Sequence, residues 1–143
     1  MKLHIRDLIQ LFNKNSYMIE DHMYQLKYLL KHDILDYKQY VNYSNKGYTR
    51  NKVYKNNLFE IYIMCWKPGQ QSIRHKHPIN GCLMKVLEGS LIEERYGVHK
   101  SLLHTYKKND ITFIKGNEEH IINNRSKTKN LITLHIYSPP NTY

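Results

Sequence analysis

The residues with the clearest chemical potential are two histidines at alternate positions, His75 and His77. On an extended strand, residues i and i+2 point to the same side, so both imidazoles would be close enough to share a metal ion. A lone His-x-His pair is weak evidence for a metal, and the other interpretation is a polar strand edge. The pair therefore indicates a metal site only if the fold brings further ligands to it.

A second group of polar side chains occupies the segment 131–138, which reads LITLHIYS. Period 2 places Thr133, His135 and Tyr137 on one face, together with Leu131, while three apolar residues occupy the other, namely Ile132, Leu134 and Ile136. Buried polar side chains need partners, so a hydroxyl, an imidazole and a phenol in one row favour a hydrogen-bond relay. A solvent-exposed face would explain the same pattern.

Two weaker signals stand apart from these segments. Tyr48 and Arg50 are another i, i+2 pair, and the guanidinium offers a planar fork for a carboxylate. His120 follows a Gly116-Asn117 turn at the expected start of a strand. Neither signal identifies a function by itself, so both depend on where the fold places them.

Helical spacing dominates before residue 44. One apolar stripe is formed by Ile5, Leu8, Ile9 and Phe12, and a second by Ile19, Met23, Leu26 and Leu30. Ser16 is the expected N-cap of the second helix. The sequence thus predicts a pair of α-helices at the N-terminus.

From residue 48 onward the pattern changes to period 2 with frequent turn residues. The expected strands are 48–54, 58–65, 72–77, 82–88, 91–96, 101–107, 111–114, 120–123 and 131–137. Turns are expected at Pro68-Gly69, Glu88-Gly89, Asn109-Asp110 and Gly116-Asn117. Many short strands at this spacing predict a mainly β protein, with a small barrel after the helices.

Composition narrows the possible partners and compartment. The chain has 143 residues, and its longest apolar run, Ile61–Trp66, is far shorter than a membrane span. Its net charge of +10 comes from scattered lysines, which favours solubility over nucleic-acid binding. The N-terminus has no apolar signal region, so we expect a cytoplasmic protein whose two cysteines, Cys65 and Cys82, are thiols.

The spacing of the metal-binding candidates resembles a known pattern. Gly69-x5-His75-x-His77-x4-Cys82-x6-Gly89 resembles the first cupin motif, with cysteine where that motif has glutamate. His120-x3-Asn124 resembles the end of the second motif. The resemblance implies a jelly-roll-like cupin barrel in which His75, His77 and His120 hold a metal. The change in periodicity already divides the chain, expected to be a single domain over 1–143, into a helical part at 1–44 and a barrel at 45–143.

A cupin motif with cysteine in the glutamate position resembles that of one family in particular, cysteine dioxygenase. Further signatures of that family resemble three segments of this chain, namely Tyr48-Thr49-Arg50, Cys65-Trp66 and Leu134–Pro140. The family implies one Fe(II) held by the three histidines. It also implies that Arg50, helped by Tyr48, binds the substrate carboxylate. The implied reaction is oxidation of free L-cysteine with O2 to cysteine sulfinic acid, a step of cysteine catabolism.

The same resemblance implies roles for the remaining candidates. Tyr137 would lie beside the iron, linked to His135 and Thr133, and could form a thioether cross-link with Cys82. Other readings stay open: a dioxygenase for 3-mercaptopropionate or cysteamine, a non-catalytic metal-binding cupin, or a nucleic-acid module. We expect a monomer that acts on a small molecule.

Three positions depart from the family pattern. Thr133 replaces the usual serine, and Gly81 stands where animal members carry histidine, which predicts a looser loop before Cys82. The sequence ends at Tyr143, whereas family members continue with a segment that helps close the pocket. Pocket closure, substrate selectivity and turnover are the properties that the absence of this segment would affect.

Overall fold

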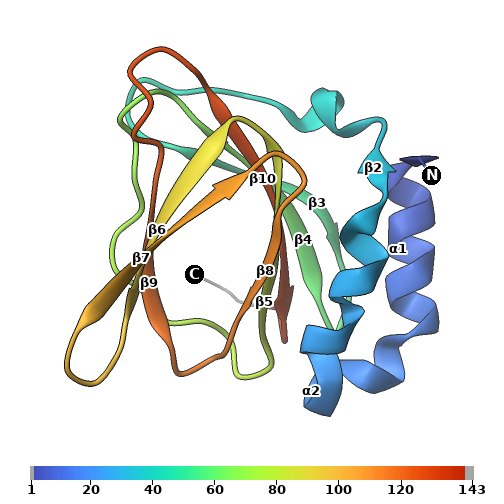
Figure 1. Ribbon diagram of the computed structural model, residues 1–143. Coiled ribbons are helices and arrows are strands. Elements are labelled where there is room, and N and C mark those ends of the chain that lie inside the picture. The colour runs from blue at the N-terminus through green and yellow to red at the C-terminus, as the bar shows by residue number, and fades with distance from the viewer. Residues whose placement is uncertain (1, 141–143) are drawn as a thin grey trace.

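Two antiparallel β-sheets face each other, and a helical N-terminal segment packs beside the larger sheet (Figure 1). This arrangement is that of the computed structural model, which describes residues 2–140. No helix within that part of the chain is long and apolar enough to cross a membrane. The mainly β architecture with helices at the N-terminus, predicted from the change in periodicity, is confirmed.

The N-terminal segment is less regular than expected. Its elements are β1 (Lys2–Leu3), α1 (Ile5–Lys14), η1 (Ser16–Met18), α2 (Ile19–His22), η2 (Met23–Lys31), β2 (Asp33–Ile34) and η3 (Tyr37–Tyr40), where η marks a 3-10 helix. The first predicted helix is present as α1. The prediction of one continuous second α-helix is wrong, because most of that region is 3-10 helix.

The spacing of buried residues explains the 3-10 conformation. Met23, Leu26 and Leu29 are all buried at intervals of three residues, which matches three residues per turn. Ser16 is not an N-cap, because it begins the short 3-10 helix η1 and α2 begins at Ile19 without a side-chain cap. The apolar stripe was therefore identified correctly and its helix type was not.

The two sheets contain eight strands. These are β3 (Thr49–Lys55), β4 (Glu60–Trp66), β5 (Gly81–Glu88), β6 (Ser90–Tyr96), β7 (Ser101–Lys107), β8 (Ile111–Ile114), β9 (Glu119–Asn123) and β10 (Leu131–Ser138). The larger sheet has the order β3-β4-β10-β5-β8 and the smaller has the order β7-β6-β9. In residues 2–140 the two sheets remain separate hydrogen-bonded units, so the expected barrel is a jelly-roll-like sandwich rather than a closed cylinder.

The segment 72–77, predicted to be a strand, is a loop. The chain from Gln71 to His75 pairs with β9 through two isolated bridges, Gln71 to Asn123 and His75 to His120. Four steps along the loop therefore oppose three steps along β9, so one extra residue interrupts the ladder as in a β-bulge. The period-2 argument for His75 and His77 consequently fails, although both residues stay close to β9.

The central strand β10 separates two cores. Ile132, Leu134 and Ile136 face the helices, in a cluster that includes Leu8 and Phe12 of α1. On its other face, Leu131 and Tyr137 join a cluster between the sheets. All residues of β10 are buried, so the two-faced pattern is confirmed and the solvent-exposed alternative is wrong.

Candidate metal centre and adjoining pocket

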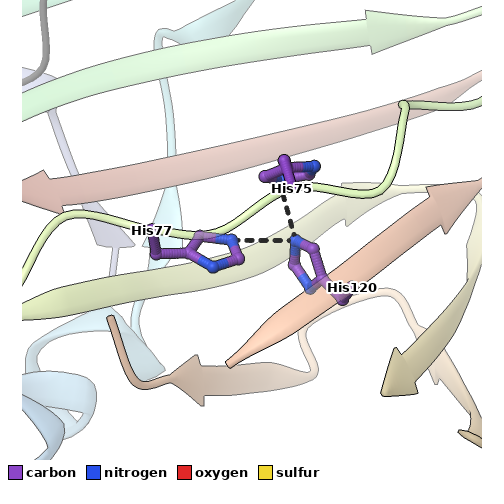
Figure 2. A group of neighbouring side chains, drawn as sticks. All are labelled: His75, His77 and His120. Carbon is purple, nitrogen blue, oxygen red and sulfur yellow. Dashed lines mark hydrogen bonds between the residues drawn. The ribbon is translucent and has the colours of Figure 1, made fainter. Parts of the chain in front are cut away.

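Three histidines converge between the two sheets (Figure 2). His75 and His77 come from the loop between β4 and β5, and His120 comes from β9. Nε2 of His120 lies 3.0 Å from Nε2 of His77 and 3.1 Å from Nε2 of His75. Each ring offers one ligand nitrogen, and these atoms all lie within 4.8 Å of one another. Residues 45 positions apart in the sequence thus meet at one point.

The loop reaches this position through backbone hydrogen bonds. The N–H groups of His75 and His120 each donate to the other residue's carbonyl at 3.2 Å, and the N–H of His77 donates to the carbonyl of Gly116. These bonds attach the loop to β9 and to the predicted Gly116-Asn117 turn. They replace the strand that the sequence pattern had suggested.

The outer nitrogen of each ring fixes its tautomer. Nδ1 of His75 lies 2.7 Å from the carbonyl of Ile73, and Nδ1 of His77 lies 3.1 Å from the carbonyl of Glu118. A carbonyl only accepts, so these Nδ1 atoms carry hydrogen and the neutral rings present Nε2 lone pairs. His120 is oriented in the same way by the carboxylate of Glu93 at 2.7 Å.

Three lone pairs that face one another need a cation between them. Burial lowers the pKa of His75, and burial together with His120 and His75 lowers the pKa of His77 to about 3, so a proton is a poor cation here. Neutral imidazole nitrogens suit divalent transition metals. The residues present therefore fit a metal ion, and the predicted ligands His75, His77 and His120 are the ones that the structure brings together.

The polar face of β10 forms a buried chain of hydrogen bonds. Oγ1 of Thr133 lies 2.7 Å from Nε2 of His135, whose Nδ1 lies 3.3 Å from the hydroxyl of Tyr137. The sequence prediction of a relay along this face agrees with these contacts. It did not include Trp66, whose indole N–H donates to Oγ1 of Thr133 at 3.0 Å.

Trp66 sets the direction of this chain. An indole only donates, so the Thr133 oxygen accepts from it and directs its own proton to Nε2 of His135. The opposite tautomer would leave the buried Thr133 hydroxyl proton without a described acceptor, which is costly. Burial lowers the pKa of His135 well below its usual value, so the ring is neutral. Its Nδ1 then carries the hydrogen and donates to the Tyr137 oxygen.

Cys82 and Tyr137 are cross-strand neighbours on β5 and β10. The Cys82 sulfur lies 3.9 Å from Nδ1 of His135 and donates to the carbonyl of Leu83. Burial raises the pKa of this thiol, so it is protonated in the structure. Cys82 and Cys65 are both free, as predicted, and both are buried. The placement of Cys82 near Tyr137 agrees with the sequence prediction.

A small cavity adjoins His75, one of the three histidines. It has a volume of about 120 Å³, and its lining includes Tyr48, Arg50, His75, His135 and Tyr137. Sites for drug-sized ligands measure roughly 300–1,000 Å³, so this one suits a molecule of few heavy atoms. Two larger hollows, of about 530 and 580 Å³, lie elsewhere, and only the first of them touches a metal-binding candidate, His77.

Aromatic rings position the two residues predicted to bind substrate. The Tyr48 ring stacks on Trp66 with centroids 4.2 Å apart. The Arg50 guanidinium carbon lies 4.7 Å from the Tyr62 ring centroid and 5.8 Å from that of Tyr137. Cation–π contacts of this kind hold the guanidinium beside the cavity.

Gly81 gives a reason for one departure from the family pattern. Its φ is +96°, and a Cβ there would lie 2.6 Å from the carbonyl oxygen of Ile114. Only glycine adopts this conformation readily, and only glycine fits. Gly81 is buried and its N–H donates to the carbonyl of Pro78, so packing and a backbone hydrogen bond hold this position; a loop looser than in animal members stays a prediction.

Glu93 is the site residue that sequence reasoning missed. It lies on β6, is fully buried, and contacts both His120 and Arg95. Although burial raises the pKa of Glu93, the hydrogen bond and charge of His120 and Arg95 hold it below its usual value. The period-2 pattern could have found it, because a glutamate on the same strand face as Leu91 has to be buried and therefore needs a partner.

Comparison with known proteins places these residues in a family context. The sequence model of the family "Cysteine dioxygenase type I" matches residues 2–143. The human protein named cysteine dioxygenase type 1 is 29% identical over 146 residues, spanning 95% of this chain and 72% of its own length.

Solved structures support the fold. A double-stranded β-helix protein from Klebsiella pneumoniae superposes with a TM-score of 0.66 at 24% identity, over 77% of this chain and 92% of its own. A cupin superfamily protein from Desulfitobacterium hafniense gives 0.61 at 10% identity, over 73% and 89%. The cupin fold predicted from motif spacing is confirmed.

Proposed function

Because the chain belongs to the cysteine dioxygenase type I family, we propose that it oxidises free L-cysteine with O2 to cysteine sulfinic acid at the three-histidine site. Both atoms of O2 enter the product, and the cysteine sulfur loses four electrons to them. The human relative named cysteine dioxygenase type 1 supports this assignment.

One observation carries the proposal. The three Nε2 lone pairs meet at one point, and one of these histidines, His75, lines a cavity of about 120 Å³ that Arg50 also lines. A metal ion that receives three neutral ligands keeps its positive charge and open coordination positions. One Fe(II) held there would activate the substrate thiol and O2. The cavity thus combines a metal site with a cation suited to a carboxylate, which are the two features that an amino-acid thiol requires.

The chain's own residues would bind and orient the substrate. Arg50 would form a bidentate contact with the cysteine carboxylate, which is the geometry a guanidinium favours. The Tyr48 hydroxyl would add a second contact, with its ring held by Trp66. The carboxylate then fixes which end of the substrate faces the three histidines, since the cavity has little room for another orientation.

Tyr137 would complete the site. Its oxygen accepts a hydrogen bond from His135, and the residue lines the cavity beside Arg50 and His75. The chain of bonds from Trp66 through Thr133 holds this arrangement. The proposed role of Tyr137 is to position the substrate and supply a proton at the phenolic oxygen.

Cys82 and Tyr137 would form a thioether cross-link during turnover. A bond between the Cys82 sulfur and the ring carbon beside the hydroxyl removes one S–H and one ring C–H hydrogen, and O2 accepts the two electrons and two protons. The cross-strand pairing of the two residues supports this step. The bond would fix the phenol ring and so preorganise the site.

The decisive experiment is O2 consumption by Fe(II)-loaded protein with a panel of thiols. L-cysteine should support the fastest uptake, with 3-mercaptopropionate and cysteamine slower, because each lacks one of the groups that the cavity would bind. Single replacements of His75, His77 or His120 by alanine should remove both metal and uptake. Metal binding without uptake for any thiol would reject the enzyme assignment and favour a non-catalytic cupin.

A further inference from the structure

Glu93 is a buried carboxylate in direct contact with one of the three histidines. It lies on β6, where its backbone position pairs with Ile122 of β9 and the neighbouring Arg95 pairs with His120. Its side chain is fully buried and its Oε2 lies 2.7 Å from Nδ1 of His120. The carboxylate therefore reaches the site diagonally across two paired strands.

The three histidines differ in what holds their outer nitrogens. His75 and His77 donate to backbone carbonyls, which carry only partial charge. His120 donates to a carboxylate, which carries a full charge. An ionised acceptor makes the imidazole a stronger donor to a metal and holds the ring in one orientation. His120 should therefore be the strongest of the three nitrogen donors.

Further contacts keep Glu93 in place. Arg95 donates to the same Oε2 at 3.2 Å, and Tyr106 donates to Oε1 at 3.4 Å. Arg95 also donates to the carbonyl of Phe113 at 3.2 Å. A buried carboxylate with a cation and two other donors stays charged and does not rotate freely. The charge is thus built into the fold rather than gained on metal binding.

The Glu93 carboxylate supplies a negative charge that the three ligands themselves lack. The cupin pattern has a glutamate there, and this chain has Cys82, so the donor set consists of three neutral rings. We propose that Glu93 is a positioning residue that supplies, through His120, the negative charge that strengthens metal binding at this site. This inference rests on the metal site of the proposed function and assigns a role to a residue outside it.

The test is the affinity of the full chain for Co(II), measured by competition with a chelator. Glu93→Gln keeps an oxygen acceptor of the same length and removes the charge. Loss of such a partner typically lowers metal affinity by about 10–100-fold, and we expect a loss in that range. Glu93→Ala, which removes the acceptor as well, should lose more.

The matched control is Glu94→Gln on the same strand. Glu94 bonds to Tyr96 and Ser101 instead of a histidine, so its replacement should leave the Co(II) affinity unchanged. Urea unfolding of the metal-free proteins separates affinity from folding. An equal affinity for wild type and Glu93→Gln would overturn the role of Glu93, as would equal losses in Glu93→Gln and Glu94→Gln. A wild-type chain that binds no Co(II) would instead overturn the metal site itself.

A measurement on the unmodified protein covers the case in which the variants do not fold. In the NMR spectrum of the Co(II)-loaded chain in H2O, the His120 ring should show a paramagnetically shifted Nδ1–H resonance. The resonance should be visible because the proton lies between two buried groups and exchanges slowly with water. Its loss after transfer to D2O would identify it as an exchangeable N–H proton. A His120 ring that lacks the Nδ1–H would overturn the proposal.

Discussion

Replacing Thr133 by valine removes one hydroxyl and leaves the shape of the side chain almost unchanged. The hydroxyl lies between two buried groups, the indole N–H of Trp66 at 3.0 Å and Nε2 of His135 at 2.7 Å. Valine would leave a donor and an acceptor without partners. A buried polar group left unpaired costs roughly 1–3 kcal/mol, so the free energy of unfolding should fall by about 2–6 kcal/mol.

Thr133→Ser is the matched control. Serine keeps the hydroxyl and loses one methyl group, which should cost only about 1 kcal/mol. Urea unfolding of the metal-free proteins, monitored by circular dichroism, measures both changes. If the valine variant is as stable as the serine variant, the buried chain of hydrogen bonds does not exist as described.

A double-mutant cycle with Trp66→Phe locates the effect. Phenylalanine removes the N–H, so valine at position 133 then leaves only the His135 nitrogen unpaired. The cost of Thr133→Val should therefore be smaller by about 1–3 kcal/mol in the Trp66→Phe background. Additive costs would refute the hydrogen bond that Trp66 donates to Thr133.

The remaining predictions concern the cavity and its walls. Arg50→Ala should lower kcat/KM for L-cysteine by roughly 30- to 1000-fold, corresponding to about 2–4 kcal/mol, and should affect cysteamine far less; equal losses would reject the carboxylate contact. Turnover should remove the mass of two hydrogens from the chain, and this loss should vanish in Cys82→Ser and Tyr137→Phe; a Cys82 thiol that stays fully alkylatable would reject the cross-link. Gly81→Ala should lower the free energy of unfolding by about 1–3 kcal/mol because of its positive φ and the nearby Ile114 carbonyl, and unchanged urea unfolding would contradict that close approach.

Strand periodicity predicted most of the β-structure. In β10, every second residue faces the helices, so the apolar and polar faces could be separated from the sequence alone. Each strand of the sandwich was expected within a few residues of its observed bounds. These elements are set by local alternation, which is visible in a single sequence.

The loop 72–77 and the region 16–31 show where local patterns fail. An extra residue opposite β9 interrupts the ladder, and its position depends on a partner far away in the sequence. Similarly, a stripe at intervals of three and four is compatible with both helix types, and the packing of Met23, Leu26 and Leu29 decides between them. Tertiary contacts, which no local pattern contains, determined both outcomes.

The residues of the site also fall into a group that the sequence predicted and a group that it did not. The three histidines could be proposed from motif spacing, because their order along the chain is preserved in the pattern. The hydrogen bond of Trp66 to Thr133 and the contact of Glu93 with His120 could not, since each side chain reaches the site across neighbouring strands. Residues that contact a metal ligand or a relay residue, but not the substrate, have no motif in the sequence. The only sequence signal for them is a polar residue at a position predicted to be buried.

The most direct test of the central claim is the fate of labelled oxygen. Fe(II)-loaded protein, L-cysteine and ¹⁸O₂ should yield cysteine sulfinic acid in which each molecule carries two labelled oxygen atoms, as measured by mass spectrometry. Replacement of His75 by alanine should abolish that product. Formation of cystine alone, or of sulfinic acid with unlabelled oxygen, would contradict dioxygenation at the three-histidine site.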